Sequence, residues 1–203
     1  MNRQGLHRFT GTPSTPQEQL ERCEMCATPV ASRHGHVVDV HRRALLCACR
    51  ACFLLFTRHR AHRARYRAVP ERYLADPGRP ISGQEWEALG IPVGVAFLLR
   101  TDTGVTVFHP SPAGATERVL DHRVWFELAA AHPLLTIAEP DVEAILFRRT
   151  ENGADCFLVP IDACYRLVGT VRRYWTGLDG GGHLHDHVDE LFAEIKDRAR
   201  TVS

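Results

Sequence analysis

The chain of 203 residues has no long apolar run and no apolar start. A membrane-spanning helix needs roughly 20 consecutive apolar residues, and no stretch of this sequence approaches that length. The first twenty residues are polar and lack the apolar segment of a secretory signal peptide. We therefore expect no membrane span and a cytoplasmic location.

The sequence does contain seven cysteines, and five of them fall within a segment of 30 residues. In a reducing compartment, cysteines that cluster in this way are more often metal ligands than disulfide partners. Two CxxC pairs, Cys23–Cys26 and Cys49–Cys52, are separated by 22 residues. Each pair places two thiolates on one tight turn, and two such turns supply the tetrahedral four-thiolate site that zinc prefers. The pattern predicts a Zn²⁺ site made by Cys23, Cys26, Cys49 and Cys52.

The segment between the two pairs favours a zinc ribbon or a treble clef. Residues 36–40 and 43–47 have the apolar and β-branched composition of strands, and a short polar turn joins them. After Cys52, the apolar residues 53–56 are enough for a short helix. The expected order is therefore cysteine turn, hairpin, cysteine turn and helix.

Two alternatives to this assignment remain open. Cys47 and Cys49 would share one face of a strand, so Cys47 is an alternative ligand in place of Cys49. We favour the interpretation that Cys47 is a small buried residue beside the site. Iron in a rubredoxin-like site would use the same four thiolates, and an iron–sulfur cluster would also need cysteines. Zinc is preferred because the pattern is typical of a structural site.

Charge is distributed unevenly along the chain. Residues 1–75 contain 13 arginines and 5 acidic residues, a net charge of +8, whereas the remainder carries −7. Residues 58–67 form a basic strip that contains Arg58, Arg60, Arg63, Arg65 and Arg67. One hypothesis is a nucleic-acid interface, because arginine binds phosphates. We favour docking on the acidic part of the chain or on a protein partner, since the chain as a whole is nearly neutral.

Composition divides the chain into four segments. We expect a flexible tail at residues 1–18, a zinc-binding module at 19–67, a connector rich in Pro, Gly and charge at 68–80, and an α+β domain at 81–200.

The periodicity of residues 81–200 predicts hairpins with interleaved helices. The expected strands are residues 93–100, 105–109, 142–148 and 156–159. The expected helices begin at Ser82, Thr116, Asp162 and Asp186, and Gly90 ends the first of them. The fold class is therefore α+β, with a small N-terminal zinc-ribbon or treble-clef-like module followed by an antiparallel sheet packed with helices.

Two further segments are candidate sites. His183, His185 and His187 form an HxHxH run that could bind a metal or belong to an exposed loop. Residues 109–117, from His109 to Glu117, are expected as a loop before a helix whose N-terminus could hold an anion. We favour a loop that is merely shaped by its prolines. No catalytic residue is assigned, and we expect a protein that is not an enzyme.

Several segments together resemble an uncharacterised family of actinobacterial proteins that are often encoded near nickel–iron hydrogenase genes. The resemblance is carried by residues 23–26, 45–52, 89–94, 110–117 and 159–169. It implies a non-enzymatic accessory role in hydrogenase assembly or electron transfer, with a hydrogenase subunit or a maturation factor as the partner. The alternatives are a nucleic-acid-binding zinc protein that uses the basic strip and a rubredoxin-like iron electron carrier.

Overall fold

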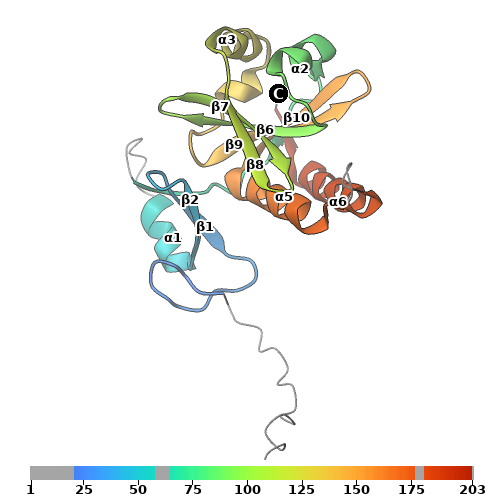
Figure 1. Cartoon of the computed structure of the whole chain (residues 1–203). Coiled ribbons are helices and arrows are strands. Elements are labelled where there is room, and N and C mark those ends of the chain that lie inside the picture. The colour runs from blue at the N-terminus through green and yellow to red at the C-terminus, as the bar shows by residue number, and fades with distance from the viewer. Residues whose placement is uncertain (1–20, 58–64, 177–180, 203) are drawn as a thin grey trace, which may run out of the picture.

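The computed structural model describes residues 21–57, 65–176 and 181–202, and these residues form two sheets of different size (Figure 1). The predicted tail, residues 1–18, and most of the basic strip, residues 58–64, lie outside the described residues. The fold class is the α+β class that the sequence predicts.

The smaller sheet belongs to the N-terminal module. Strands β1 (Gly35–Asp39) and β2 (Ala44–Ala48) form an antiparallel hairpin, and β3 (Tyr66–Ala68) pairs with the other edge of β1. Helix α1 (Arg50–Thr57) begins directly after Cys49 and contains Cys52. The elements therefore follow in the predicted order, but the helix begins within the second cysteine pair and not after it.

The core of this module is small. It consists of Val37, Ala48 and Phe53, with a few partly buried neighbours. A core of this size supplies little hydrophobic stabilisation, which is the situation in which small modules rely on a bound metal.

The larger sheet has eight strands and forms the centre of the molecule. Its order is β11-β4-β10-β9-β6-β7-β8, and β5 pairs with the end of β10. Every pairing is antiparallel except that of β11 with β4. The strands are β4 (Leu74–Ala75), β5 (Ile81–Ser82), β6 (Val95–Thr101), β7 (Gly104–Ser111), β8 (Gly114–Val119), β9 (Glu143–Thr150), β10 (Gly153–Pro160) and β11 (Arg200–Thr201).

Helices cover both faces of the large sheet. Helices α5 (Ile161–Tyr174) and α6 (Gly182–Arg198) cover one face, and α2 (Gly83–Leu89), α3 (His122–Ala131) and α4 (Pro133–Thr136) cover the other (Figure 1). Successive residues of a strand point to opposite faces. In β9, Ala144 and Leu146 therefore join the core under α5 and α6, while Ile145 and Phe147 join the core under α2 to α4.

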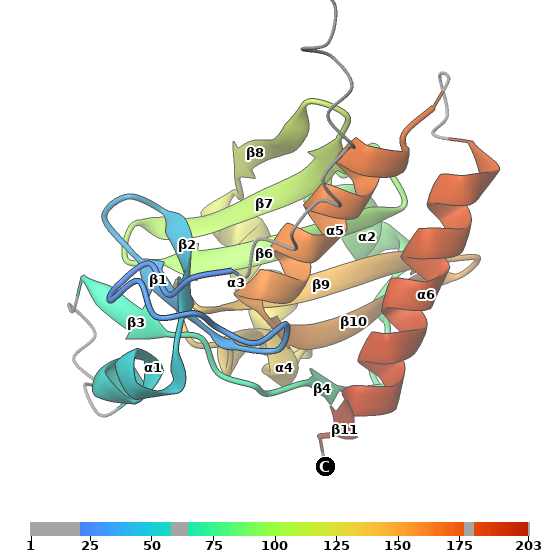
Figure 2. The ribbon, with the colours of Figure 1, turned by 90° about the horizontal axis from the view of Figure 1, so that it is seen from below.

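The N-terminal module lies beside α5, as Figure 2 shows from below. Val38 of β1 and Val69 belong to the same core cluster as α5 and α6. Residues 68–80, which we expected to be a connector, contribute β4 to the large sheet and bury Tyr73 at 7% exposure. The two sheets thus share one apolar cluster.

The predicted first helix of the large domain is confirmed in detail. Ser82 and Glu85 form a reciprocal capping box at the start of α2, and Gly90 ends the helix in the left-handed conformation with φ 59°.

The prediction of a helix that begins at Thr116 is wrong. Residues 114–119 form β8, an edge strand that pairs with β7, and α3 begins only at His122. Asp121 is the N-cap, and its side chain accepts a hydrogen bond from the backbone N–H of Arg123. Because every residue of β8 after Gly114 is exposed, apolar spacing gave no signal for this strand.

The predicted start of the last helix is also wrong. We expected Asp186 to be its cap, but α6 begins four residues earlier, at Gly182. Leu184 is buried at 6% exposure and extends the apolar stripe of Leu191, Phe192 and Ile195 by two turns. This added burial favours the longer helix.

Candidate metal centre

The structure brings Cys23, Cys26, Cys49 and Cys52 together. Their sulfur atoms all lie within 4.8 Å of one another, and Cys26 Sγ and Cys49 Sγ are 3.7 Å apart. Cys23 is 1% exposed, whereas Cys26 is at the surface. Four thiols at these separations are compatible with a metal site.

The two cysteine turns are built by local backbone hydrogen bonds. In the first turn, Cys23 N–H donates to Thr28 O at 2.8 Å and Ala27 N–H donates to Cys23 O at 2.7 Å. Ala27 has φ 61°, a conformation that lets the chain reverse tightly after Cys26. In the second turn, Cys52 N–H donates to Cys49 Sγ at 3.5 Å. Such N–H donors stabilise a thiolate.

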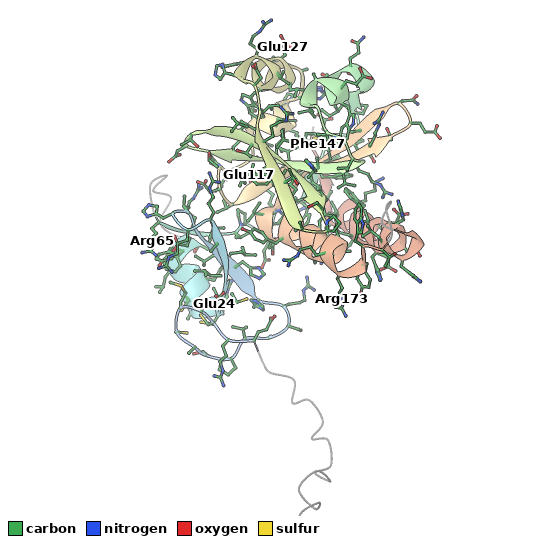
Figure 3. The ribbon with its side chains drawn as sticks, viewed as in Figure 1. Glu24, Arg65, Glu117, Glu127, Phe147 and Arg173 are labelled. Carbon is green, nitrogen blue, oxygen red and sulfur yellow. The ribbon has the colours of Figure 1, made fainter. Side chains whose placement is uncertain are left out.

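Glu24 joins the first turn to the hairpin. Its backbone N–H donates to Cys47 O at 2.9 Å, and its carboxylate accepts from Cys47 N–H at 2.7 Å. Figure 3 shows Glu24 in the N-terminal module. These two hydrogen bonds hold the turn of Cys23 and Cys26 against the end of β2, directly before Cys49.

The thiols of the site differ in acidity. A hydrogen bond from the Thr28 hydroxyl, together with neighbouring thiols, lowers the pKa of Cys26 to about 6. Burial works against ionisation of Cys23, but backbone N–H groups, foremost that of Cys49, lower its pKa on balance. Burial raises the pKa of Cys52 to about 12. Cys26 thus offers a thiolate near neutral pH, while a metal must displace the proton of Cys52.

Cys47, the alternative ligand, does not belong to this group of four sulfurs. It lies in β2 opposite His36 of β1, and its Sγ lies within 4.8 Å of ring nitrogens of His34 and His36. This second grouping was not predicted from the sequence. The signal that could have found it is the hairpin register, which pairs residues 36 and 47 once the turn is known.

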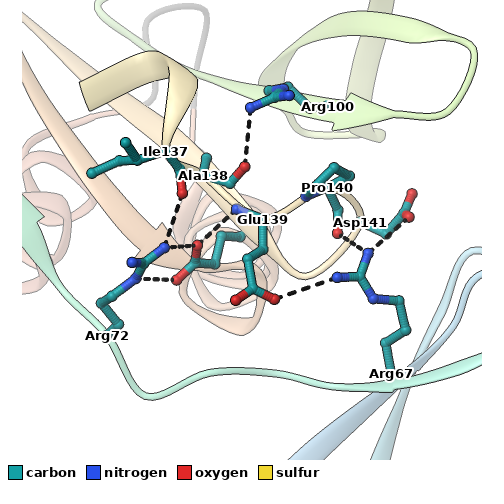
Figure 4. A network of polar contacts seen from close by, with 9 residues as sticks. Arg67, Arg72, Arg100, Ile137, Ala138, Glu139, Pro140 and Asp141 are labelled. Carbon is teal, nitrogen blue, oxygen red and sulfur yellow. Dashed lines mark hydrogen bonds and ion pairs between the residues drawn. The ribbon is translucent and has the colours of Figure 1, made fainter. Parts of the chain in front are cut away.

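The described arginines of the basic strip are engaged within the chain. Arg65 donates to the buried carboxylate of Asp39 through Nε at 3.1 Å and Nη2 at 2.8 Å. Arg67 donates to Pro140 O at 2.6 Å and lies 3.4 Å from carboxylate oxygens of both Glu139 and Asp141 (Figure 4). Arg67 therefore ties the small sheet to the loop before β9.

The HxHxH run, made of His183, His185 and His187, lies in the first turns of α6 and not in a loop. His185 Nδ1 is 2.9 Å from Gly181 O, and His187 Nδ1 is 3.2 Å from a carboxylate oxygen of Glu190. Among the described residues, the groups of three or more potential ligands are the four cysteines and the His34, His36 and Cys47 cluster.

The segment from His109 to Glu117 is a hairpin and not a loop before a helix. His109 pairs with Thr116, and the turn is closed at Ser111 and Gly114. The anion-binding helix terminus that we considered for this segment is therefore not present there.

Two cavities border the N-terminal module. One, of about 730 Å³, lies between the module and α5, and His34, His36 and Asp162 are among its lining residues. The other, of about 630 Å³, lies between the module, α5 and strands β6 to β8. Cys164 is among the lining residues of this second cavity but is 0% exposed to solvent. Burial raises the pKa of its thiol well above the ordinary value.

The fold and the site together define an α+β protein with a cysteine-rich N-terminal module that is suited to a metal. The chain belongs to a family of unknown function, DUF5947, whose profile matches residues 22–199. No curated protein and no solved structure matches the chain. None of the helices in the described parts of the chain has the length and apolar character to cross a membrane.

Proposed function

We propose that Cys23, Cys26, Cys49 and Cys52 hold a structural zinc ion and that the protein is a non-enzymatic accessory protein that binds a protein partner. The observation that carries this proposal is the mutual approach of four sulfurs to within 4.8 Å. Four protein ligands occupy all four coordination positions of a tetrahedral zinc ion. The ion therefore has no open position for a substrate, and its role is to stabilise the fold.

The surface next to the site supports a partner-binding role. Helix α1 begins directly after Cys49 and exposes two large apolar side chains, Leu54 at 44% and Leu55 at 63%. Adjacent exposed leucines on a short helix are suited to contact with another protein. From the resemblance described above, we propose a nickel–iron hydrogenase subunit or maturation factor as that partner. None of the seven cysteines, all of which are described, forms a disulfide. We propose a cytoplasmic setting, because clustered cysteines of this kind are typical of reducing compartments.

Metal analysis tests the first half of the proposal. The purified protein should contain zinc in a colourless four-thiolate site, and Cys49→Ser should lose it. Cys156→Ser is the matched control, because Cys156 is buried in the core of the large sheet and should leave the metal content unchanged. A red protein with stoichiometric iron and little zinc would support the iron electron carrier instead.

Co-purification with the host's own nickel–iron hydrogenase subunits and maturation factors tests the second half. The wild type should retain one of them, and Leu55→Asp should lose it while keeping its metal. Val119→Asp is the control, because Val119 is exposed at 73% on the edge strand β8, outside the N-terminal module. Equal retention by Leu55→Asp would contradict a contact through α1, and no retention of any hydrogenase protein by the wild type would contradict this choice of partner.

A further inference from the structure

A second set of metal-binding side chains lies in the N-terminal module. One ring nitrogen each of His34 and His36 and the sulfur of Cys47 lie within 4.8 Å of one another. The antiparallel register of β1 and β2 places His36 opposite Cys47, and His34 directly precedes β1. The two rings are 4.8 Å apart between centroids and inclined by 57°. None of the three residues belongs to the four-cysteine site.

Both imidazoles are oriented through Nδ1. His34 Nδ1 lies 2.8 Å from Ala31 O, and the carboxylate of Glu21 is 3.6 Å from the same nitrogen. His36 Nδ1 lies 3.0 Å from Asp162 Oδ2. Carbonyl and carboxylate oxygens accept hydrogen bonds, so in the neutral form of each ring Nδ1 carries the proton and Nε2 has a lone pair for a metal. This arrangement, with a carboxylate or carbonyl behind the ring, is the usual support of a metal-binding histidine.

His34 supplies an independent observation. Its side chain is 8% exposed, and its Nε2 is buried without a hydrogen-bond partner among the described residues. A buried polar atom without a partner costs stability, and native structures rarely retain one without a reason. A cation bound to this nitrogen would supply the missing partner.

We propose that His34, His36 and Cys47 bind a second cation of the zinc class, separate from the structural zinc. Two imidazoles and one thiolate suit zinc, because it accepts nitrogen and sulfur ligands in tetrahedral sites. Binding replaces the proton of the Cys47 thiol, which is released to solvent. Three protein ligands leave the fourth position of a tetrahedral ion open. His34 and His36 line the cavity of about 730 Å³, so water or a small ligand can reach that position from the cavity.

Zinc stoichiometry at controlled free zinc tests this proposal. Equilibrium dialysis followed by elemental analysis should find two zinc ions in the wild-type chain, and one in each of His34→Ala, His36→Ala and Cys47→Ser. His41→Ala is the control, because His41 is exposed and should leave two ions bound. Cobalt as a spectroscopic probe should give an unchanged four-thiolate spectrum in His36→Ala, which would demonstrate that the module is still folded.

The possible results separate the two sites. Two zinc ions retained in His36→Ala would overturn the second site. One zinc in the wild type that depends only on the four cysteines would also overturn it, while leaving the structural zinc intact. One zinc that is lost in His36→Ala but kept in Cys49→Ser would instead contradict the structural zinc of the proposed function and support the second site.

Discussion

Arg72 and Glu143 form a forked ion pair in which the carboxylate is fully buried. Arg72 Nε lies 2.8 Å from Glu143 Oε1, and Nη2 lies 2.5 Å from Oε2. Glu143 is 0% exposed and accepts a further hydrogen bond from Glu139 N–H at 2.8 Å, while Arg72 Nη2 also donates to Ile137 O (Figure 4). The pair fixes the segment before β4 to the first residue of β9.

Removal of the arginine should therefore be costly. Arg72→Met leaves a buried carboxylate without its cation, and we expect a loss of about 3 kcal/mol in the free energy of unfolding, the lower end for a buried pair because Arg72 is partly exposed. Urea unfolding at neutral pH measures this loss. Arg123→Met, on the exposed side of α3, should change stability by less than about 0.5 kcal/mol. Equal effects of the two substitutions would contradict a structural role for the pair.

Gly153 should tolerate no side chain. It has φ 151°, and a Cβ atom there would lie 1.9 Å from Ile81 O of the neighbouring strand. Gly104 also has a positive φ, of 141°, but nothing lies within 4 Å of its Cβ position. Gly104→Ala therefore measures backbone strain alone, about 1–2 kcal/mol, and Gly153→Ala should cost clearly more. Thermal melts of the two variants make the comparison, and equal melting temperatures would contradict the steric argument.

Local patterns were sufficient for much of the fold. The capping box of Ser82 and Glu85 and the two CxxC pairs depend on residues close in sequence, and the structure contains these local features as expected. Strand β8 could not be predicted because an exposed edge strand has no apolar alternation.

Other features depend on contacts between distant segments. The pairing of Arg72 with Glu143 joins residues 71 positions apart. Neither composition nor periodicity encodes this pairing, because both describe only one segment at a time. The opposition of His36 and Cys47 is different, because it follows from the register of a local hairpin.

Chelation should unfold the small module before the large sheet. Its own core is limited to Val37, Ala48 and Phe53, whereas binding of a structural zinc contributes about 10–16 kcal/mol to modules of this kind. After treatment with a strong chelator, backbone amides of residues 21–57 should exchange hydrogen much faster. Amides of β9 and β10 should stay protected, which makes them the internal control. Unchanged exchange in the small module would mean that its fold does not require a metal.

Acid should weaken the ion pair between Asp39 and Arg65. This carboxyl is 2% exposed, and its hydrogen bonds from Arg65 hold its pKa below the ordinary value. A lowered folded-state pKa stabilises the protein above the unfolded value of about 3.9, and this stabilisation is lost as pH falls through the folded value. Wild type should exceed Asp39→Asn in stability at neutral pH, and the difference should shrink below about pH 4. Asp102→Asn, in an exposed hairpin, is the control. A difference that does not vary with pH would contradict this linkage.

The basic strip should serve docking and not nucleic-acid binding. Arg67 is 11% exposed and lies between Glu139 and Asp141, so Arg67→Glu should place three carboxylates together and cost about 3 kcal/mol. Arg60→Glu, a matched charge reversal in the same strip, tests the rival function. Binding to nucleic acid would fall with salt with a log–log slope of about −0.9 for each phosphate contact on duplex DNA. We expect no salt-sensitive binding of labelled DNA or RNA by the wild type. Submicromolar binding near physiological salt that Arg60→Glu abolishes without a change in melting temperature would overturn docking and favour a nucleic-acid-binding protein.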